Sequence, residues 1–259
     1  MATHHPSIPL NQQIVLVTGG ARGLGASLVD AFLRAGARVV INYHTSQAAA
    51  RQRADQAPGQ ALALQADIRD AAAIQRLAAQ AQASFGGPIT TVVNNALPNF
   101  QFNGDARPTL AQLSWDTLAA QMGAVQGALN TTQATLPGME SLGFGRIINI
   151  GTNLFQNPVV PYHDYTAAKA ALLALTRTAA QDLGPAGITV NMISGGLLHT
   201  TDASAATPQA VFDLIAASTP LRRVVTPDEL ADAALFFASP WARAVTGQNL
   251  VVDGGLVKN

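Results

Sequence analysis

The chain contains no cysteine and few charged residues. Without cysteine it has neither disulfides nor thiolate metal ligands, and no group of His, Asp and Glu has metal-ligand spacing, so we expect no metal. Lys and Arg together number 15, as do Asp and Glu, which gives a formal net charge of zero. Because no basic run is long enough to follow a phosphate backbone, the composition argues against nucleic-acid binding.

Long apolar stretches are also missing. No run of about 18 apolar residues is present to span a membrane, and segment 1–10 lacks the apolar run of a signal peptide. We therefore expect a cytoplasmic protein without membrane contact. Residues 1–10 are expected to form a flexible tail and residues 11–259 a single domain, because no Pro-, Gly- or Ser-rich linker divides them.

The low charge also bears on assembly. Charged residues make up 12% of the chain and hydrophobic residues 48%, whereas about 25% of an average soluble domain is charged. This composition predicts that partner subunits cover part of the surface, as in a homo-oligomer. The alternative is a monomer with a weakly charged surface.

Short apolar runs alternate along the chain with longer Ala- and Leu-rich stretches. The runs are apolar throughout, which is typical of strands covered on both faces. Repeated alternation predicts an α/β protein with a doubly wound Rossmann fold and a mostly parallel seven-stranded sheet. The expected strands are 14–18, 38–42, 61–65, 91–94, 146–150, 188–193 and 249–252, and the expected helices are 25–35, 46–56, 70–84, 109–137, 164–183 and 227–238.

Two long excursions, 97–110 and 195–220, follow expected strand ends. In a doubly wound sheet the carboxyl ends of the strands form the edge at which ligands bind. We therefore expect both excursions to border the ligand site.

A glycine-rich turn joins the first expected strand to the first expected helix, between Thr18 and Gly25. Glycines at 19, 23 and 25 let the backbone approach a pyrophosphate with no Cβ in the way. The start of the helix offers N–H groups and the positive end of its dipole. The turn is therefore predicted to bind a dinucleotide, the alternative being a purely structural strand–helix turn.

Tyr165 and Lys169 lie early in an expected helix, and their spacing of four places both side chains on one face. A nearby ammonium lowers the pKa of a phenol from its usual value near 10, which makes the pair a proton donor to a carbonyl. Thr152 follows the fifth expected strand, and its hydroxyl is expected to hold the substrate oxygen. The alternative for Thr152 is a residue that caps local backbone.

The Thr-Gly-x-x-x-Gly-x-Gly spacing over 18–25, together with Thr152 and Tyr165-x-x-x-Lys169, resembles the short-chain dehydrogenase/reductase family. The resemblance covers nearly the whole chain and is greatest to the 3-oxoacyl-acyl-carrier-protein reductase-like proteins, which are typically tetrameric. It implies a homotetrameric oxidoreductase that reduces a ketone, with Tyr165 as proton donor. The residues expected to contact the dinucleotide are Thr18, Gly19, Arg22, Gly23, Leu24, Gly25, Asn42, His44, Ser46, Asp67, Ile68, Asn94, Asn95, Ala96, Tyr165, Lys169, Gly195, Gly196, Leu198 and Thr200.

The choice of nicotinamide cofactor depends on the end of the second expected strand. An NAD enzyme usually has an acid there, which binds the ribose 2′-hydroxyl, but residues 42–46 contain none. Arg22 in the glycine turn is suited to pair with a 2′-phosphate, and Asn42, His44 and Ser46 are expected to add hydrogen bonds. The sequence therefore favours NADP(H) over NAD(H), the alternative for Arg22 being a solvated cation.

The sequence departs from the family pattern at three places. Thr152 replaces the usual Ser, and Gly195 replaces a usual Pro, which is expected to loosen the following loop. Ala124 stands where the family usually has an Asn that helps to hold a water linking the lysine to solvent. A proton relay then needs another polar group, and Gln121 and Gln126 are the candidates.

The substrate is expected to be a small-molecule carbonyl compound. Segment 137–144 has no Lys or Arg, and Pro185-Ala186 occupies a place where basic residues often occur, so docking of an acyl carrier protein is not assured. Two other functions stay open, an NAD-dependent alcohol or sugar dehydrogenase and a catalytically impaired dinucleotide-binding sensor. The expected substrate contacts are Leu154, Phe155, Tyr162 and Leu197, with Phe100 and Phe102 in a wider apolar set.

Overall fold

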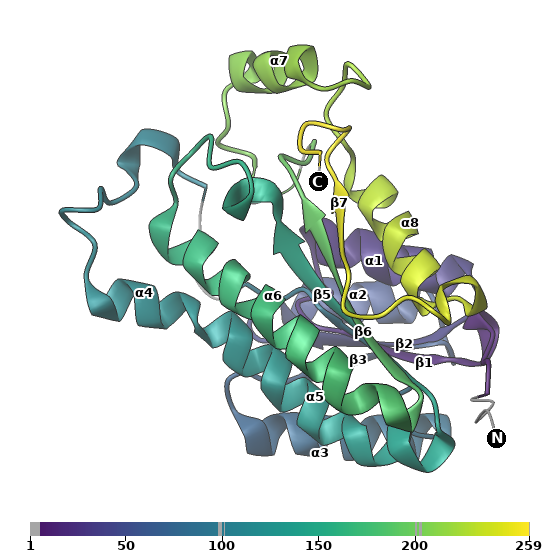
Figure 1. The fold of residues 1–259 in the computed structure, drawn as a ribbon. Coiled ribbons are helices and arrows are strands. Elements are labelled where there is room, and N and C mark those ends of the chain that lie inside the picture. The colour runs from purple at the N-terminus through teal and green to yellow at the C-terminus, as the bar shows by residue number, and fades with distance from the viewer. Residues whose placement is uncertain (1–5, 98–99, 101, 200, 202–203, 259) are drawn as a thin grey trace.

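A computed structural model describes residues 6–97, 100, 102–199, 201 and 204–258 (Figure 1). The expected tail is described from Pro6 onward, and within it the carbonyl of Ile8 accepts a hydrogen bond from Gln13 Nε2 at 2.8 Å. Thr200, an expected coenzyme contact, lies outside the described residues. Within the described chain, no helix has the length and apolar character that crossing a membrane requires.

One seven-stranded sheet organises the molecule, and its strand order is β3-β2-β1-β4-β5-β6-β7. Every pairing between neighbouring strands is parallel. The predicted doubly wound α/β fold is therefore confirmed. The order reverses between β1 and β4, which places the ligand crevice beyond their carboxyl ends. The strands are β1 (Ile14–Val17), β2 (Arg38–Tyr43), β3 (Ala61–Gln65), β4 (Thr91–Asn94), β5 (Gly145–Thr152), β6 (Ile188–Gly195) and β7 (Asn249–Val252).

Helices cover both faces of the sheet. Figure 1 shows α3, α5 and α6 along one face, with α1, α2 and α8 along the other, while α7 stands away from the sheet. The helices are α1 (Gly23–Arg34), α2 (Gln47–Asp55), α3 (Ala71–Phe85), α4 (Trp115–Gln121), α5 (Gly123–Leu142), α6 (His163–Leu183), α7 (Gln209–Ser218) and α8 (Pro227–Ala238). Short 3-10 turns are η1 (Leu10–Gln12), η2 (Gly104–Ala106), η3 (Asn153–Phe155), η4 (Gly184–Ala186) and η5 (Pro240–Ala242).

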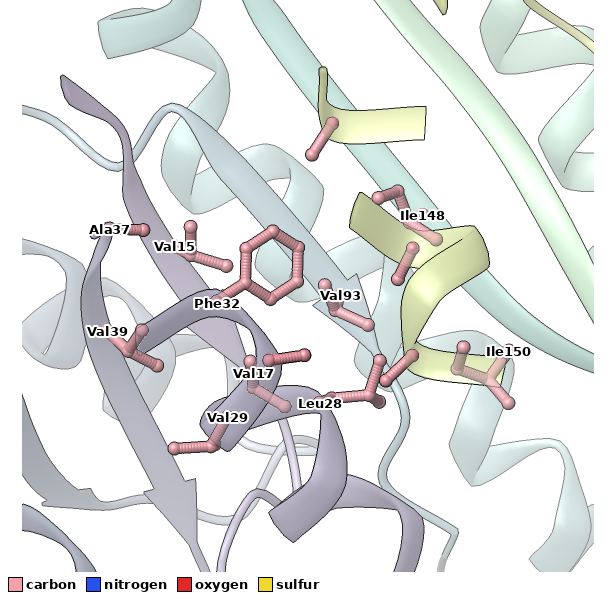
Figure 2. Packing of buried hydrophobic residues seen from close by; sticks show 14 of the residues in the cluster. Val15, Val17, Leu28, Val29, Phe32, Ala37, Val39, Val93, Ile148 and Ile150 are labelled. Carbon is pink, nitrogen blue, oxygen red and sulfur yellow. The ribbon is translucent and has the colours of Figure 1, made fainter. Parts of the chain in front are cut away.

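The alternation of side chains along β1 divides the core into two layers. Val15 and Val17 join the cluster beneath α1 and α8, and Ile14 and Leu16 join the cluster beneath α3, α5 and α6. Figure 2 shows Phe32 of α1 among the β-branched side chains of the first layer. Since successive strand residues point to opposite faces, a strand buried on both sides is apolar at every position, as the sequence predicted.

The prediction of one helix over 109–137 is wrong. The chain forms α4 and α5 instead, and α4 begins only after Ser114, whose side chain accepts from the backbone N–H of Thr117. Pro137 lies inside α5, which ends at Gly143 with φ of 62°. A glycine in the left-handed region ends a helix more decisively than a proline that removes one donor near its last turns.

Helix α7 was not predicted, because it lies within the excursion 195–220. Of its side chains only Phe212 is buried, whereas Leu214 is 65% exposed. A helix with so narrow a buried face gives little periodic signal in the sequence.

Candidate active site

Thr18 fastens the glycine turn to the end of β4. Its hydroxyl accepts hydrogen bonds from the backbone N–H groups of Asn95 (2.9 Å) and Ala96 (3.0 Å), and it lies 3.3 Å from the carbonyl of Val93. The Asn95 amide donates to the carbonyl of Thr18 at 3.0 Å. Three expected coenzyme residues thus meet at the point where the strand order reverses.

The backbone of the turn fits a dinucleotide pyrophosphate. A Cβ on Gly25 would lie 2.1 Å from the carbonyl oxygen of Gly19, and Gly19 and Gly23 have φ of +62° and +53°. Around Gly23 there is space, since a Cβ there would meet only Thr201, at 3.8 Å. Helix α1 begins at Gly23, and its N-cap residue makes no side-chain cap hydrogen bond. Backbone N–H groups at a helix start without a capping side chain are a binding site for phosphate oxygens.

Asn42 joins the end of β2 to the same turn. Its carbonyl accepts from the N–H of Gly20 at 3.0 Å, and its side-chain oxygen lies 3.4 Å from the N–H of Gly19. Its amide nitrogen donates to the carbonyl of Ala66 at 3.0 Å, and the residue is 1% exposed. In the structure this expected coenzyme contact holds the glycine turn through its backbone carbonyl and its side-chain oxygen, while its amide nitrogen ties it to the residue that follows β3.

The contact between Gly20 and Asn42 brings two exposed basic residues to one edge of the site. Arg22 follows Gly20 by two residues, and His44 follows Asn42 by two residues. Ser46 is half-buried and precedes α2 without capping it through its side chain. This edge, where an NAD enzyme usually has an acid, thus carries one arginine and one histidine.

Asp67 and Ile68 follow β3, the strand that pairs with β2 on the side away from β1. Asp67 pairs with Arg69 at 2.7 Å, and the hydrogen bond from Arg69 lowers the Asp67 pKa to about 2. His44 Nε2 lies 4.0 Å from the same carboxylate. Ile68 packs so closely on α5 that a Cβ at Gly127 would lie 2.3 Å from its Cδ1. Arg69 was missed at the sequence level, because a guanidinium two residues after an acid is common on solvated surfaces.

The three expected catalytic residues meet between the end of β5 and the start of α6. Thr152, Tyr165 and Lys169 are 5%, 6% and 4% exposed. Lys169 Nζ donates to the carbonyl of Ile150 at 2.6 Å and lies 5.8 Å from the centre of the Tyr165 ring. The Thr152 hydroxyl also accepts from the N–H of Leu154 at 3.3 Å, so it caps local backbone as well. A hydroxyl with one accepted hydrogen bond still has a proton to donate to a substrate oxygen.

Burial dominates the protonation of this trio. It raises the Tyr165 pKa to about 12, against the opposing effect of the Thr152 hydroxyl, and it lowers the Lys169 pKa to about 8. The sequence argument expected the lysine to lower the tyrosine pKa. The structure reverses that direction, because loss of solvent disfavours the phenolate and the ammonium alike.

A buried polar network lies beneath the site. Asn94 donates to Asn149 Oδ1 at 2.9 Å and accepts from the Thr131 hydroxyl at 2.7 Å. Asn149 in turn donates to the Thr176 hydroxyl at 2.8 Å. The Asn94 side chain, an expected coenzyme contact, therefore ties β4 and β5 to α5 and α6.

The end of β6 closes the site from the other side. A Cβ on Gly195 would lie 2.7 Å from a side chain of α8, and one on Gly196 would lie 3.1 Å from Asn153 Nδ2. Leu198 forms an isolated parallel bridge with the segment before α8 and packs on the core, whereas Leu197 is half-buried. A larger residue in place of the glycine that replaces the expected proline would require Leu230 to move.

Comparison with known proteins agrees with this geometry. A family model described as enoyl-(acyl carrier protein) reductase matches residues 19–257. The chain belongs to the short-chain dehydrogenase/reductase family. As a member of this family it is an oxidoreductase, and the family resemblance stated from the sequence is confirmed.

Relatives match over almost their whole length. An acetoacetyl-CoA reductase of Allochromatium vinosum is 34% identical, over 94% of this chain and 98% of the relative. A protein of Rhizobium meliloti named probable galactose dehydrogenase is 33% identical, over 95% of this chain and 96% of the relative. Among solved structures, a gluconate 5-dehydrogenase of Burkholderia cenocepacia in complex with NADP and tartrate superposes with a TM-score of 0.83 at 31% identity, covering 94% of both chains.

Ala124 is the main departure from the short-chain dehydrogenase/reductase pattern. It is 6% exposed in the first turn of α5. Gln126 is exposed, and its side-chain amide donates to the carbonyl of Arg69 at 3.1 Å, two residues after Asp67. Gln121 is 5% exposed at the end of α4. Of the two glutamines considered for a proton relay, Gln121 is therefore the interior one.

The four expected substrate contacts separate into different surroundings. Leu154 and Tyr162 pack in one cluster with Tyr165, and Phe100 and Phe102 lie against it. The ring of Phe155 instead packs with a different cluster, formed by Ala128, Leu172 and Met192. The family resemblance did not predict which of these aromatic residues lie beside Tyr165.

A second missed feature links the active site to the C-terminal strand. Asn153, next to Thr152, donates to the buried carboxylate of Asp253 at 2.9 Å. Asp253 also accepts from the backbone N–H groups of Gly255 and Val257, both at 3.0 Å. The hydrogen bond spans a sequence separation of 100 residues, which no local pattern reveals.

Proposed function

We propose that this oxidoreductase reduces a ketone to a secondary alcohol with NADPH. The observation that carries the proposal is the burial of Thr152, Tyr165 and Lys169 together, beside a glycine turn shaped for a pyrophosphate. NADPH, when bound, supplies hydride from C4 of its nicotinamide. Reduction of ketones followed by NADPH absorbance tests the proposal.

Thr152, Tyr165 and Lys169 have different roles at the substrate oxygen. The Thr152 hydroxyl holds the carbonyl oxygen beside the phenol, and Tyr165 donates its proton to that oxygen. A pKa of about 12 keeps Tyr165 protonated at neutral pH, which suits it to donate in the direction of reduction. Lys169, whose pKa is lowered to about 8, is able to return a proton to the phenol.

The Lys169 pKa predicts the pH dependence of reduction. The ammonium is present below about pH 8 and is lost as the pH rises through that value, so kcat/KM should fall about tenfold per pH unit above it. Steady-state rates from about pH 6 to about pH 10 measure this. In Lys169→Arg the guanidinium stays charged, so whatever activity remains should show no such fall. A wild-type profile that is flat to about pH 10 would contradict the role of Lys169.

Arg22 supports a preference for NADP(H) over NAD(H). We expect Arg22→Ala to raise KM for NADPH about 10- to 100-fold, because a charge-assisted hydrogen bond contributes about 1.5–3 kcal/mol and 1.4 kcal/mol is a factor of ten. KM for NADH should stay within about twofold, since NADH has no 2′-phosphate.

Parallel kinetics with both coenzymes measure the Arg22 effect. Arg76, an exposed arginine on α3, provides the matched control Arg76→Ala, which should change neither constant. Equal losses with NADPH and NADH would mean that Arg22 does not recognise the 2′-phosphate.

Two relatives favour a second candidate, an NAD-dependent alcohol or sugar dehydrogenase. They are named for galactose and gluconate, although the gluconate enzyme was solved with NADP. Oxidation of sugars and polyols with NAD⁺, at rates above ketone reduction with NADPH, would favour this candidate. Coenzyme binding without turnover in either direction would favour a sensor, which the retained trio argues against.

We also propose that the chain assembles as a homotetramer. Large apolar side chains are exposed on and beside α8 and β7, with Trp241 at 82%, Phe236 at 39% and Leu250 at 38%. Exposed apolar groups on adjoining elements are typical of subunit contacts. Light scattering that gives the mass of one chain would contradict the proposal.

A further inference from the structure

Two aromatic rings contact the ring of Tyr165, and a third packs against both of them. Phe100 stacks on the Tyr165 ring, with ring centroids 4.6 Å apart and planes inclined by 20°. Phe102 meets it edge-on at 5.4 Å and 79°. Tyr162 contacts both phenylalanines edge-on, at 5.4 Å and 5.5 Å. These separations and angles are the preferred arrangements of aromatic pairs, so the rings form an ordered wall beside the reacting group.

A hydrogen bond from Gly104 holds the third ring, that of Tyr162, in place. The Tyr162 hydroxyl accepts a hydrogen bond from the N–H of Gly104 at 2.8 Å, and Arg107 donates to the carbonyl of the same residue at 3.0 Å. Phe100 and Phe102 also contact each other edge-on at 4.9 Å. Tyr162 is 6% exposed although it precedes α6 in a loop. Phe100, Phe102 and Gly104, which follow β4 in the chain, thus contact the active site through rings and one hydrogen bond.

The rest of the cluster is aliphatic. Leu154, Leu97 and Val160 complete the surroundings of the Tyr165 ring. A hydroxyl or carboxylate of a substrate placed among these groups would lose its hydration without gaining a hydrogen bond from them, which costs several kcal/mol for a charged group. A planar apolar group would instead gain ring contacts of the kind the wall already makes.

We propose that the substrate is an uncharged ketone whose carbonyl is flanked by an aryl ring, and that Phe100 and Phe102 select it. This inference rests on the proposed reductase function. The carbonyl carbon accepts hydride and the oxygen accepts the Tyr165 proton, so that NADPH becomes NADP⁺ and the ketone becomes a secondary alcohol. Sugars, polyols and oxo acids would be poor substrates here, although two of the similar proteins are named for galactose and gluconate.

A substrate panel with NADPH and with NADH tests the inference. The ketones are acetophenone, butanone, dihydroxyacetone and acetoacetate. We expect kcat/KM for acetophenone to exceed the values for dihydroxyacetone and acetoacetate by at least about tenfold, as a difference of 1.4 kcal/mol requires. Preference for either polar ketone would overturn the inference and leave the reductase function intact.

Variants of Phe100 test whether this residue selects aryl ketones. Phe100→Ala should lower kcat/KM for acetophenone about tenfold, mainly through KM, and for butanone less than about threefold, because an aromatic contact and its buried area are lost. Phe100→Leu keeps apolar bulk without the ring and should give an intermediate loss. The control is Phe85→Leu, which should change neither value, because Phe85 ends α3 and contacts Arg38 at the start of β2, whereas the site lies at the carboxyl ends of the strands. Equal losses for both ketones in Phe100→Ala would overturn the assignment.

Binding of benzamide, a non-reducible aryl carbonyl compound, separates this inference from the proposed function. Calorimetry on the protein with NADP⁺ should show binding that Phe100→Ala weakens about tenfold. If no ketone is reduced but benzamide binds in this way, the reductase function fails and the aryl site stands. If benzamide does not bind and no ketone is reduced, both fail.

Discussion

Replacing Tyr165 with phenylalanine is expected to lower kcat for ketone reduction by about 10²- to 10⁴-fold, the usual contribution of a general acid. The change removes only the hydroxyl, and the ring that stacks on Phe100 stays in place. Coenzyme affinity should stay within about threefold of wild type, because the glycine turn and its contacts are untouched. Single-turnover rates with NADPH, together with coenzyme titrations, measure both quantities.

The same substitution at another tyrosine controls for the loss of a buried phenol. The chain has three tyrosines, and Tyr43 is 5% exposed at the end of β2 within the core beneath α1. Tyr43→Phe should leave kcat within about twofold of wild type, because no reacting group is removed. Wild-type turnover in Tyr165→Phe would show that the proton comes from another group.

Replacing Gly25 with alanine is expected to lower the affinity for NADPH and NADH by at least about 100-fold. The added Cβ would lie 2.1 Å from the carbonyl oxygen of Gly19, a backbone atom that cannot rotate away as a side chain does. The start of α1 must then move away from the turn, and the loss of two hydrogen bonds to the pyrophosphate, at about 1.5–3 kcal/mol each, lowers the affinity by at least about 100-fold. The free energy of unfolding should fall by about 1–3 kcal/mol, as in other overpacked interiors.

Titration with each coenzyme and denaturant unfolding test this expectation. Gly184→Ala is the matched control, because a Cβ there meets nothing within 4 Å and its φ is −52°. That variant should bind both coenzymes normally and be equally or slightly more stable. Normal coenzyme binding by Gly25→Ala would mean that the turn does not hold the dinucleotide.

The sheet was the part of the fold most directly predictable from the sequence. The strands expected at 61–65, 91–94 and 249–252 coincide with β3, β4 and β7, and β5 exceeds its prediction by one residue at the start and two at the end. Strands buried on both faces must be apolar throughout, so each appears as a bounded run of β-branched residues. The break between α4 and α5 has no such signature, because it falls at Met122, which makes no side-chain cap hydrogen bond, and because α4 packs against α6.

Within the candidate active site, motif spacing predicted the catalytic residues but not their surroundings. Tyr165 and Lys169 were found because a spacing of four is a local property of helices. Their pKa values were not, because burial depends on every element that covers them. Asp253 and Arg69 were missed for a related reason. Asp253 accepts its hydrogen bond from Asn153, 100 residues earlier in the chain, and Arg69 matters only through its ion pair with Asp67.

The sequence by itself determined that this is a doubly wound α/β oxidoreductase with a glycine turn at the first strand and a Thr–Tyr–Lys trio near the fifth. These features follow from periodicity and short spacings, which the local geometry of strands and helices imposes. Only the tertiary structure decided that Phe100 and Phe102, rather than Phe155, lie against Tyr165, and that burial raises the Tyr165 pKa. Both depend on packing between segments that are distant in the sequence, and such contacts have no period in it.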